Sequence, residues 1–319
     1  MTLHPEARRL LDQLARSDWS TGDLAHASRM RDRFAAEDRS LSAEPLPIRR
    51  VFDMAIQARR HQIPLRIYVP SRQGLAGSLV WLHGGGFVFG SIGSSDVVAR
   101  AISAAARCVV ASVDYRLAPE HPFPAGLEDA HAVLDWLFEH APDFGAPAGR
   151  LAVGGDSAGG CLAAATTLLS RDQGRPAIAG QVLVYPMTCA GFEDWEVDGL
   201  DEVRHPNVPW IHWLWKLYLD GHSPLDPLAS PLSAPSLDGL PPALVLTAEY
   251  DTLRAEGERY ATRLRDAGVP VKLRRFDGMI HGFLDYSSVP GLAKIGQEAI
   301  SEIGRALRQF FSVAESRGS

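Results

Sequence analysis

The sequence predicts a single α/β domain built around a mainly parallel β-sheet. From residue 78 onward, short apolar stretches alternate with helix-like stretches, which is typical of a parallel sheet covered on both faces by helices. Within residues 151–160, an apolar strand runs through a glycine-rich turn into an Ala- and Leu-rich helix. The chain has 319 residues, 46% of them hydrophobic and 22% charged, so it can bury a sizeable core.

The expected elements follow from hydrophobic periodicity. Apolar and polar residues alternate over residues 49–58 and 63–69, as in an antiparallel hairpin at a sheet edge. Six apolar stretches are expected to be further strands, at residues 79–82, 108–113, 151–154, 181–185, 243–248 and 271–276. Helices are expected between several of these strands and at the end of the chain, at about residues 95–106, 125–140, 157–171, 254–267 and 291–313.

Two segments fall outside this alternation. Residues 4–38 carry apolar positions at helical spacing and predict two amphipathic helices. About sixty residues separate the strands that begin at 181 and 243, which is too long for a structureless loop. Aromatic and apolar residues recur there at helical spacing, namely Ile211, Leu214, Trp215 and Tyr218. Such a stripe usually packs into a core, but it follows the carboxyl edge of the sheet, where open α/β sheets bind ligands.

Charge and cysteine usage exclude several classes of partner. The net charge of −6 at pH 7 provides no basic surface for nucleic acid or anionic lipid, so neither partner is expected. The three cysteines follow no disulfide or metal-binding spacing, so we expect a reducing compartment and no metal. With no long apolar stretch and no export signal, the sequence predicts a soluble cytoplasmic protein. The tryptophans and the last helix could support a homodimer.

Residues 155–159, Gly-Asp-Ser-Ala-Gly, match the pattern G-x-S-x-G, in which a strand turns sharply into a helix and exposes a serine. Side chains two places before and after the serine would collide in so tight a turn, which explains Gly155 and Gly159. Ser157 would then project from the carboxyl edge of the sheet, above a helix N-terminus that favours a nearby anion. Ordinary strand-to-helix turns also show this pattern, but the flanking strand and helix favour a nucleophile.

A nucleophilic serine needs a base and a group that orients the base. In α/β-hydrolases these follow in the order serine, acid, histidine, each in a loop after a strand. His281 is the last histidine of the chain and follows the last expected strand, so it is the candidate base. Asp251 lies just beyond the carboxyl end of the strand expected at 243–248 and is the preferred acid, with Glu249 and Asp277 nearby. Asp277 shares a loop with His281, whereas the motif takes its acid from a different strand end.

The oxyanion of an acyl-transfer reaction needs hydrogen-bond donors. One is expected from the backbone N–H of Ala158, which follows the nucleophile. Others are expected from residues 83–87, His-Gly-Gly-Gly-Phe, because three glycines let the backbone turn its N–H groups toward a substrate. A phosphate-binding loop is disfavoured because no Gly-Lys-Ser/Thr follows and no G-x-G-x-x-G fingerprint is present. His83 precedes the glycines and is interpreted as structural.

Five motifs together resemble the bacterial hormone-sensitive-lipase-like esterases, family IV, over about residues 48–310. They are HGGGF at 83–87, DYRLAPEHPFPA at 114–125, GDSAGG at 155–160, AEYDTL at 248–253 and HGF at 281–283. The resemblance implies the α/β-hydrolase fold and a catalytic triad of Ser157, His281 and Asp251. It implies an oxyanion hole made by the N–H groups of Gly85, Gly86 and Ala158. It also implies hydrolysis of short acyl esters without a cofactor.

The same resemblance implies a cap over the site. Residues 1–45 would form its N-terminal part, and an insertion at about residues 190–220 would complete it on a catalytic domain of residues 46–319. Thr252 stands where the family commonly has proline, and Ser95-Asp96 stand where it often has a His-Asp pair. The cap matches the family least. Four residues in the cap and beside the glycine loop are candidates for contacts with the substrate, namely Phe87, Trp210, Trp213 and Leu214.

The sequence therefore predicts a serine hydrolase that cleaves carboxylic esters with uncharged, short to medium acyl chains through an acyl-enzyme intermediate. Two alternatives stay open. The same residues could act on a lactone, an amide or an acetylated natural product, or transfer the acyl group to an alcohol. An inactive hydrolase fold could instead serve as a small-ligand receptor, although such a protein would be expected to lack a triad member.

Overall fold

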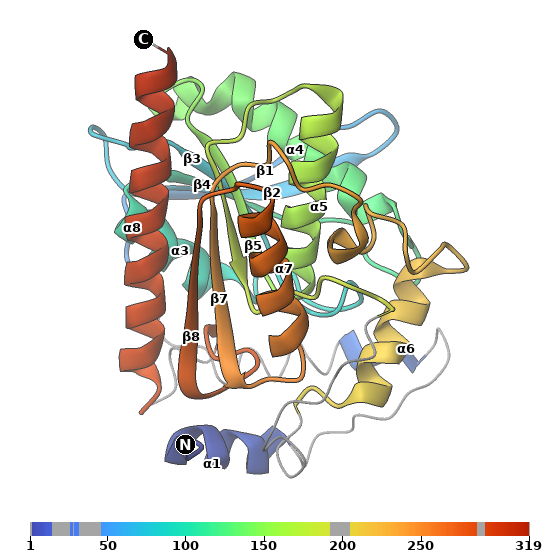
Figure 1. Cartoon of the computed structure of the whole chain (residues 1–319). Coiled ribbons are helices and arrows are strands. Elements are labelled where there is room, and N and C mark those ends of the chain that lie inside the picture. The colour runs from blue at the N-terminus through green and yellow to red at the C-terminus, as the bar shows by residue number, and fades with distance from the viewer. Residues whose placement is uncertain are drawn as a thin grey trace.

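The computed structural model describes residues 2–14, 26–27, 29–31, 46–191, 205–285 and 291–318. It contains one eight-stranded sheet in the order β1-β2-β4-β3-β5-β6-β7-β8 (Figure 1). The strands are β1 (Arg50–Gln57), β2 (Gln62–Val69), β3 (Ser78–Leu82), β4 (Val109–Val113), β5 (Leu151–Asp156), β6 (Gly180–Val184), β7 (Ala243–Tyr250) and β8 (Val271–Ile280). The hairpin β1–β2 is antiparallel and joins β4 at one edge, whereas β3 to β8 run parallel. The predicted α/β fold is confirmed.

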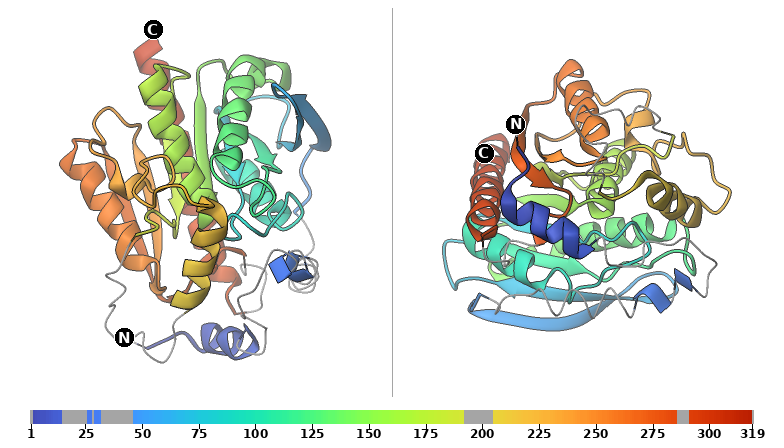
Figure 2. Two further views of the ribbon diagram at one scale, coloured as in Figure 1. Left: turned by 90° about the vertical axis from the view of Figure 1, so that its right-hand side faces the viewer. Right: turned by 90° about the horizontal axis from the view of Figure 1, so that it is seen from below.

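Helices cover both faces of this sheet. The α-helices are α1 (Pro5–Leu14), α3 (Asp96–Ala106), α4 (Ala125–His140), α5 (Ala158–Gln173), α6 (Val208–Leu219), α7 (Arg254–Asp266) and α8 (Ala293–Gly318), and two short 3-10 helices are η1 (Ala141–Phe144) and η2 (Pro231–Ser233). α3 and α8 pack side by side on one face, and α4, α5 and α7 lie on the other (Figures 1 and 2).

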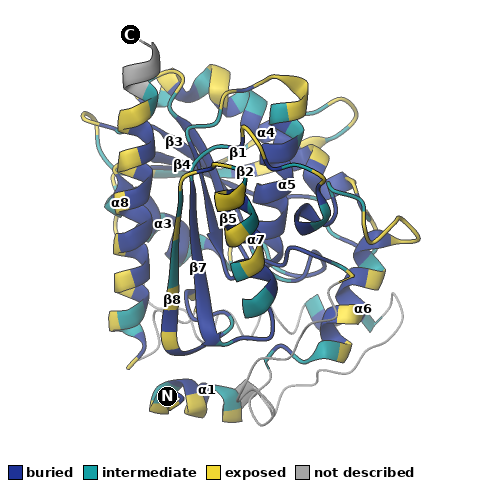
Figure 3. Ribbon diagram, viewed as in Figure 1, coloured by how far each residue is buried: buried dark blue, intermediate teal, exposed yellow. Residues whose placement is uncertain are grey.

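The core lies on both sides of the sheet because successive strand residues point to opposite faces. In β3, Val80 and Leu82 join the buried cluster beneath α4, α5 and α7, whereas Leu79 and Trp81 join the cluster beneath α3 and α8. Figure 3 shows the resulting pattern, with buried strands and helices that are exposed on their outer sides. This explains why the central strands are continuous apolar stretches in the sequence.

Two helices lie at the edge where the parallel strands end (Figure 1). The segment containing α1 buries Leu3, Ala7 and Leu10 against the α3–α8 side of the core. α6 begins where the Asn207 side chain accepts a hydrogen bond from the N–H of Trp210 at 2.9 Å, a typical helix cap. The carboxyl edge of the sheet is therefore covered by segments distant in sequence.

Parts of the predicted cap fall outside the described residues. The second N-terminal helix is described only at residues 26–27 and 29–31, whose backbone is helical. Trp195, in the insertion, lies outside the described residues. The division into residues 1–45 and 46–319 stays a prediction. Across the helices of the described chain, none has both the length and the hydropathy needed to cross a membrane.

Candidate active site

Ser157 alone forms the turn between β5 and α5. Its backbone has φ +53° and ψ −118°, a conformation that costs a residue with a side chain about 1–3 kcal/mol. Two hydrogen bonds hold it there: its N–H donates to the Val184 carbonyl at 2.8 Å, and its carbonyl accepts from the N–H of Met187 at 3.1 Å. The end of β6 therefore fixes the direction of the serine hydroxyl.

The glycines around Ser157 are required by close backbone approach. A Cβ atom on Gly155 would overlap the backbone of Gly159 and the Leu82 carbonyl oxygen. A Cβ atom on Gly159 would overlap the same Leu82 oxygen. The collision inferred from the G-x-S-x-G spacing thus involves both glycines and the end of the neighbouring strand β3.

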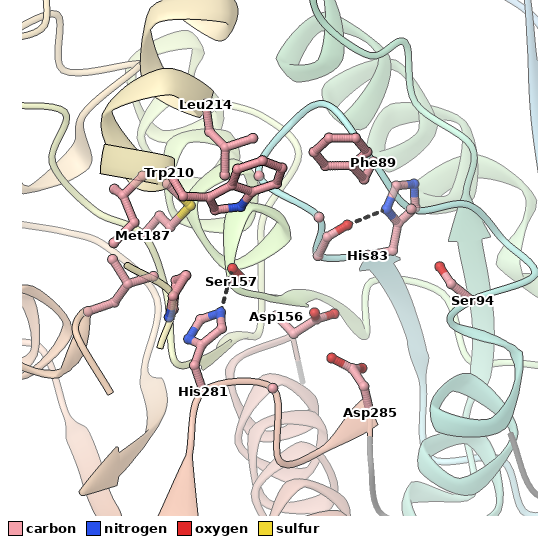
Figure 4. Close-up of a pocket in the computed structure, with 18 of the residues that line it drawn as sticks. His83, Phe89, Ser94, Asp156, Ser157, Met187, Trp210, Leu214, His281 and Asp285 are labelled. Atoms are coloured by element: carbon pink, nitrogen blue, oxygen red, sulfur yellow. Dashed lines mark hydrogen bonds between the residues drawn. The ribbon is translucent and has the colours of Figure 1, made fainter. Parts of the chain in front are cut away.

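The side chains of Ser157, His281 and Asp251 lie in a hydrogen-bonded row. His281 directly follows β8, and its Nε2 lies 3.0 Å from the Ser157 Oγ (Figure 4). Asp251 directly follows β7, and its Oδ2 lies 2.9 Å from the His281 Nδ1. A carboxylate only accepts hydrogen bonds, so Nδ1 carries the hydrogen and Nε2 can accept the serine proton. This geometry suits general-base catalysis.

Asp251 is fully buried and held in place. Its Oδ1 accepts a hydrogen bond from the N–H of Leu253 at 2.8 Å. The other two candidate acids, Glu249 and Asp277, lie in different surroundings. The Glu249 carboxylate accepts from the N–H of Gly278 at 2.6 Å, where it supports the end of β8, and Asp277 lines a separate cavity beside residues 2–5. Of these three acids, Asp251 is the one whose carboxylate is hydrogen-bonded to His281.

Two further side chains surround the imidazole of His281. The Tyr185 ring lies 4.7 Å from the His281 ring, and its hydroxyl donates to Asp285 at 3.2 Å. His205 lines the same cavity as His281. Burial, together with the positive charge that His281 can carry, lowers the pKa of His205 to about 3. His205 is therefore neutral at neutral pH.

The glycine loop lies across the cavity from His281. Gly85 and Gly86 have φ of +114° and +61°, which residues with a side chain rarely adopt, and both line the cavity. The Gly85 carbonyl accepts from the N–H groups of Val88 at 3.1 Å and Phe89 at 2.8 Å, closing a tight turn. Ala158 begins α5, where the first N–H groups of a helix have no partner within it. Gly85 and Gly86 therefore line the same cavity as Ser157, and Ala158 directly follows Ser157 in the chain.

His83 holds the start of the glycine loop. Its Nδ1 lies 2.8 Å from the Gly84 carbonyl oxygen, and its ring stacks on Tyr115 at 4.3 Å. The Tyr115 hydroxyl donates to the His83 carbonyl at 2.7 Å. Burial lowers the pKa of His83, against the raising effect of the Gly84 carbonyl. These contacts agree with the structural role expected for His83 from the sequence, because they fix its ring between Gly84 and Tyr115.

The cavity beside Ser157 has a volume of about 160 Å³. Trp210, Leu214 and Met187 lie on one side of Ser157, whereas Asp156, Asp285 and Ser94 lie on the other (Figure 4). Its walls therefore differ in polarity. Ile211, from the apolar stripe of the sequence, also lines the cavity, together with four residues that the sequence did not single out, namely Phe89, His205, Pro206 and Leu253.

Of the four predicted contact residues, Trp210 and Leu214 line the cavity, and Phe87 and Trp213 do not. Phe87 has φ +65°, and its ring stacks on Tyr218 at 3.8 Å. Trp213 is buried behind the wall and packs on Trp210 at 4.8 Å. The left-handed turn directs Phe87 into the packing beneath α6. Trp213 instead packs between Trp210, Phe89 and the ring of His26.

Nothing in the described part of the chain forms a cluster of three or more His, Cys, Asp or Glu residues suited to a metal ion. The three cysteines are free and buried. Burial raises the pKa of the Cys108 and Cys161 thiols, which disfavours the thiolate. The groups that line the cavity beside Ser157 include the His281 imidazole, the carboxylates of Asp156 and Asp285 and the backbone of residues 84–86.

Known proteins share both the fold and much of the sequence. A family model described as alpha/beta hydrolase fold matches residues 79–285. The carboxylic ester hydrolase LipN of Mycobacterium tuberculosis is 42% identical over 270 residues, which cover 82% of this chain and 71% of LipN. An arylesterase of Saccharolobus solfataricus is 36% identical over 271 residues, covering 83% of this chain and 85% of the arylesterase.

Solved structures agree over nearly the whole chain. An esterase of Pyrobaculum calidifontis superimposes with a TM-score of 0.86 at 38% identity and covers 96% of this chain and 98% of its own. An alpha/beta hydrolase from the metagenome of Lake Arreo gives a TM-score of 0.89 at 36% identity, covering 98% and 99%. With the sequence motifs and the sheet described above, these matches establish that the chain belongs to the α/β-hydrolase fold family, among the hormone-sensitive-lipase-like esterases.

Proposed function

We propose that this protein is a serine carboxylesterase that works through an acyl-enzyme intermediate. The observation that carries the proposal is the row of side chains in which His281 lies 3.0 Å from the Ser157 hydroxyl and 2.9 Å from Asp251. The names of its relatives, which include a carboxylic ester hydrolase and an arylesterase, support the same reaction class. The completeness of the row argues against an inactive small-ligand receptor.

In the proposed mechanism, Ser157 Oγ attacks the ester carbonyl carbon while His281 Nε2 takes its proton. The oxyanion accepts hydrogen bonds from the N–H groups of Gly85, Gly86 and Ala158. His281 then gives the proton to the departing alcohol, which leaves an acylated Ser157. Water attacks this ester with His281 again as the base, the carboxylic acid leaves, and the proton returns to Ser157. Asp251 orients the imidazole and stabilises its charged form.

The size and the apolar wall of the cavity favour substrates with short to medium, uncharged acyl chains. Its volume of about 160 Å³ is below the ~300–1,000 Å³ of typical small-molecule pockets. Trp210 and Leu214 give one wall an apolar surface, which favours hydrocarbon groups.

We further propose a cytoplasmic location, supported by the three free cysteines, because structural disulfides are typical of exported proteins.

The proposal is tested by Ser157→Ala with p-nitrophenyl butyrate as substrate. We expect kcat to fall by at least about a thousandfold, because the nucleophile is lost while binding contacts are kept. Ser312→Ala, an exposed serine on α8, serves as the control and should keep wild-type activity. Wild-type hydrolysis by Ser157→Ala would refute the proposal. A series from acetate to decanoate esters should give the highest kcat/KM at short to medium chains.

A further inference from the structure

Arg31, in the N-terminal region, contacts the loop that carries the proposed oxyanion donors. Its Nε donates to the Val88 carbonyl at 2.7 Å, and its Nη2 donates to the Ala118 carbonyl at 2.5 Å. The same guanidinium binds both carboxylate oxygens of Glu120, with distances of 2.8 and 2.5 Å. One planar fork of donors thus joins three segments that are far apart in sequence, an arrangement that lysine cannot reproduce.

The glycine loop contains a turn with positive φ angles at Gly85, Gly86 and Phe87. Phe87 is a non-glycine residue with φ +65°, and such a conformation persists only where surrounding contacts hold it. The Phe87 carbonyl accepts from the N–H of Ala118 at 2.9 Å, and the N–H of Val88 donates to the Gly85 carbonyl at 3.1 Å. Arg31 binds the carbonyls of both Val88 and Ala118, so it contacts the turn and also the segment that is hydrogen-bonded to the turn.

The residues around Arg31 are anchored rather than loosely laid on the surface. Ala27 and Met30 are buried in the main hydrophobic cluster. The His26 ring contacts Trp213 of α6 edge-on at 5.9 Å. The described part of the N-terminal region therefore packs on both helix α6 and the glycine loop.

We propose that Arg31 is a positioning residue for the oxyanion hole. By holding the carbonyls of Val88 and Ala118, it fixes the turn that directs the N–H groups of Gly85 and Gly86 toward the cavity. Donors held in place before the reaction stabilise the transition state more than the bound substrate. The inference rests on the proposed esterase function and assigns the N-terminal segment a part in catalysis beyond covering the site.

Arg31→Met removes all of these hydrogen bonds and keeps an unbranched stem. We expect kcat for p-nitrophenyl butyrate to fall by at least about tenfold, but by less than about a hundredfold, because loss of a whole donor costs about a hundredfold or more. KM should stay within about twofold of the wild-type value. The affinity for a short-chain trifluoromethyl ketone should fall by the same factor as kcat/KM, because its Ser157 adduct places an oxyanion in the same hole. Arg29→Met, at an exposed arginine of the same segment, is the matched control and should leave all three quantities unchanged.

Arg31→Lys keeps the positive charge near Glu120 but not the fork, so it should also lower kcat. It decides the question if Arg31→Met does not fold. Wild-type kcat in a folded Arg31 variant, or an equal loss in Arg29→Met, would overturn the inference. So would an effect confined to KM or thermal stability. Ser157→Ala separates the two proposals: if it retained activity the proposed function would fail, whereas an inactive Ser157→Ala with a fully active Arg31→Met would reject only the role of Arg31.

Discussion

The hydroxyl of Thr252 donates a hydrogen bond to the backbone carbonyl of Pro206, 2.7 Å away and 46 residues earlier in the chain. Thr252 follows Asp251, and Pro206 follows His205, which lines the cavity. The loop that carries the proposed catalytic acid is therefore bonded directly to a wall of the cavity. The resemblance to the esterase family places a proline at position 252, which has no hydroxyl, so this chain has a link that the usual residue cannot make.

Thr252→Val should destabilise the protein and disturb the cavity wall. Valine keeps the buried volume but leaves the Pro206 carbonyl without this donor, which costs about 1–3 kcal/mol. Urea unfolding should report that loss, and KM for p-nitrophenyl butyrate should rise. Thr252→Ser keeps the donor and should keep a KM close to that of the wild type. Equal KM values in Thr252→Val and the wild type would contradict the assigned link.

His205 should make the protein less stable in acid. Burial lowers its pKa in the folded state from 6.5 to about 3, so between these values the unfolded chain binds the proton more readily. Stability is therefore lost as the pH falls from 6.5 toward 3, by up to about 1.4 kcal/mol per pH unit. Urea unfolding of His205→Gln between pH 7 and 4.5 should give a shallower acid loss than that of the wild type. Parallel pH profiles would show that His205 does not carry this effect.

Glu256 should have the opposite pH dependence. Its side chain is fully buried, and burial raises its pKa well above 4.5, opposed by the N–H of Thr188, which donates to Oε1 at 2.6 Å. The folded state binds this proton more tightly, so the associated stability is present below pH 4.5 and is lost as the pH rises through the raised pKa. Glu256→Gln stays neutral, and its stability relative to the wild type should increase from pH 5 to 9. A constant difference over that range would exclude a neutral buried acid.

Leu214→Ala should shift the chain-length preference toward longer esters. Leu214 lines the cavity next to Gly86, where an added Cβ atom would overlap the leucine side chain. Removing this side chain widens the apolar wall, so kcat/KM should rise for octanoate relative to butyrate. Trp213→Phe changes a buried neighbour that does not line the cavity and should leave the preference unchanged. An unaltered ratio in Leu214→Ala would place the acyl chain elsewhere.

The strands could be predicted because central parallel strands are buried on both faces and are therefore continuously apolar. The carboxyl ends of β3 and β4 were also predicted, at residues 82 and 113, but those of β7 and β8 were not. β7 and β8 were expected to end at residues 248 and 276, but the ladder continues to the pair Tyr250 and Ile280. Polar residues such as Glu249 and Asp277 interrupt the apolar pattern while the backbone pairing persists. Hydrogen bonding, rather than hydrophobicity, determines these ends.

The row of Ser157, His281 and Asp251 could be anticipated because each residue follows a strand, and parallel strands bring their carboxyl ends to one edge. The walls of the cavity could not. Residues 85–87 turn through left-handed backbone conformations, which places Phe89 rather than Phe87 at the cavity. His205 lies in a segment with no periodic pattern, and only the tertiary packing brings it beside His281.

Peptide mapping by mass spectrometry after reaction with a fluorophosphonate tests directly whether Ser157 is a nucleophile activated by His281. We expect one adduct, on the peptide that contains Ser157, with slower labelling in His281→Ala and none at this position in Ser157→Ala. An adduct on a different serine in the wild type, or rapid labelling that does not depend on His281, would contradict this assignment.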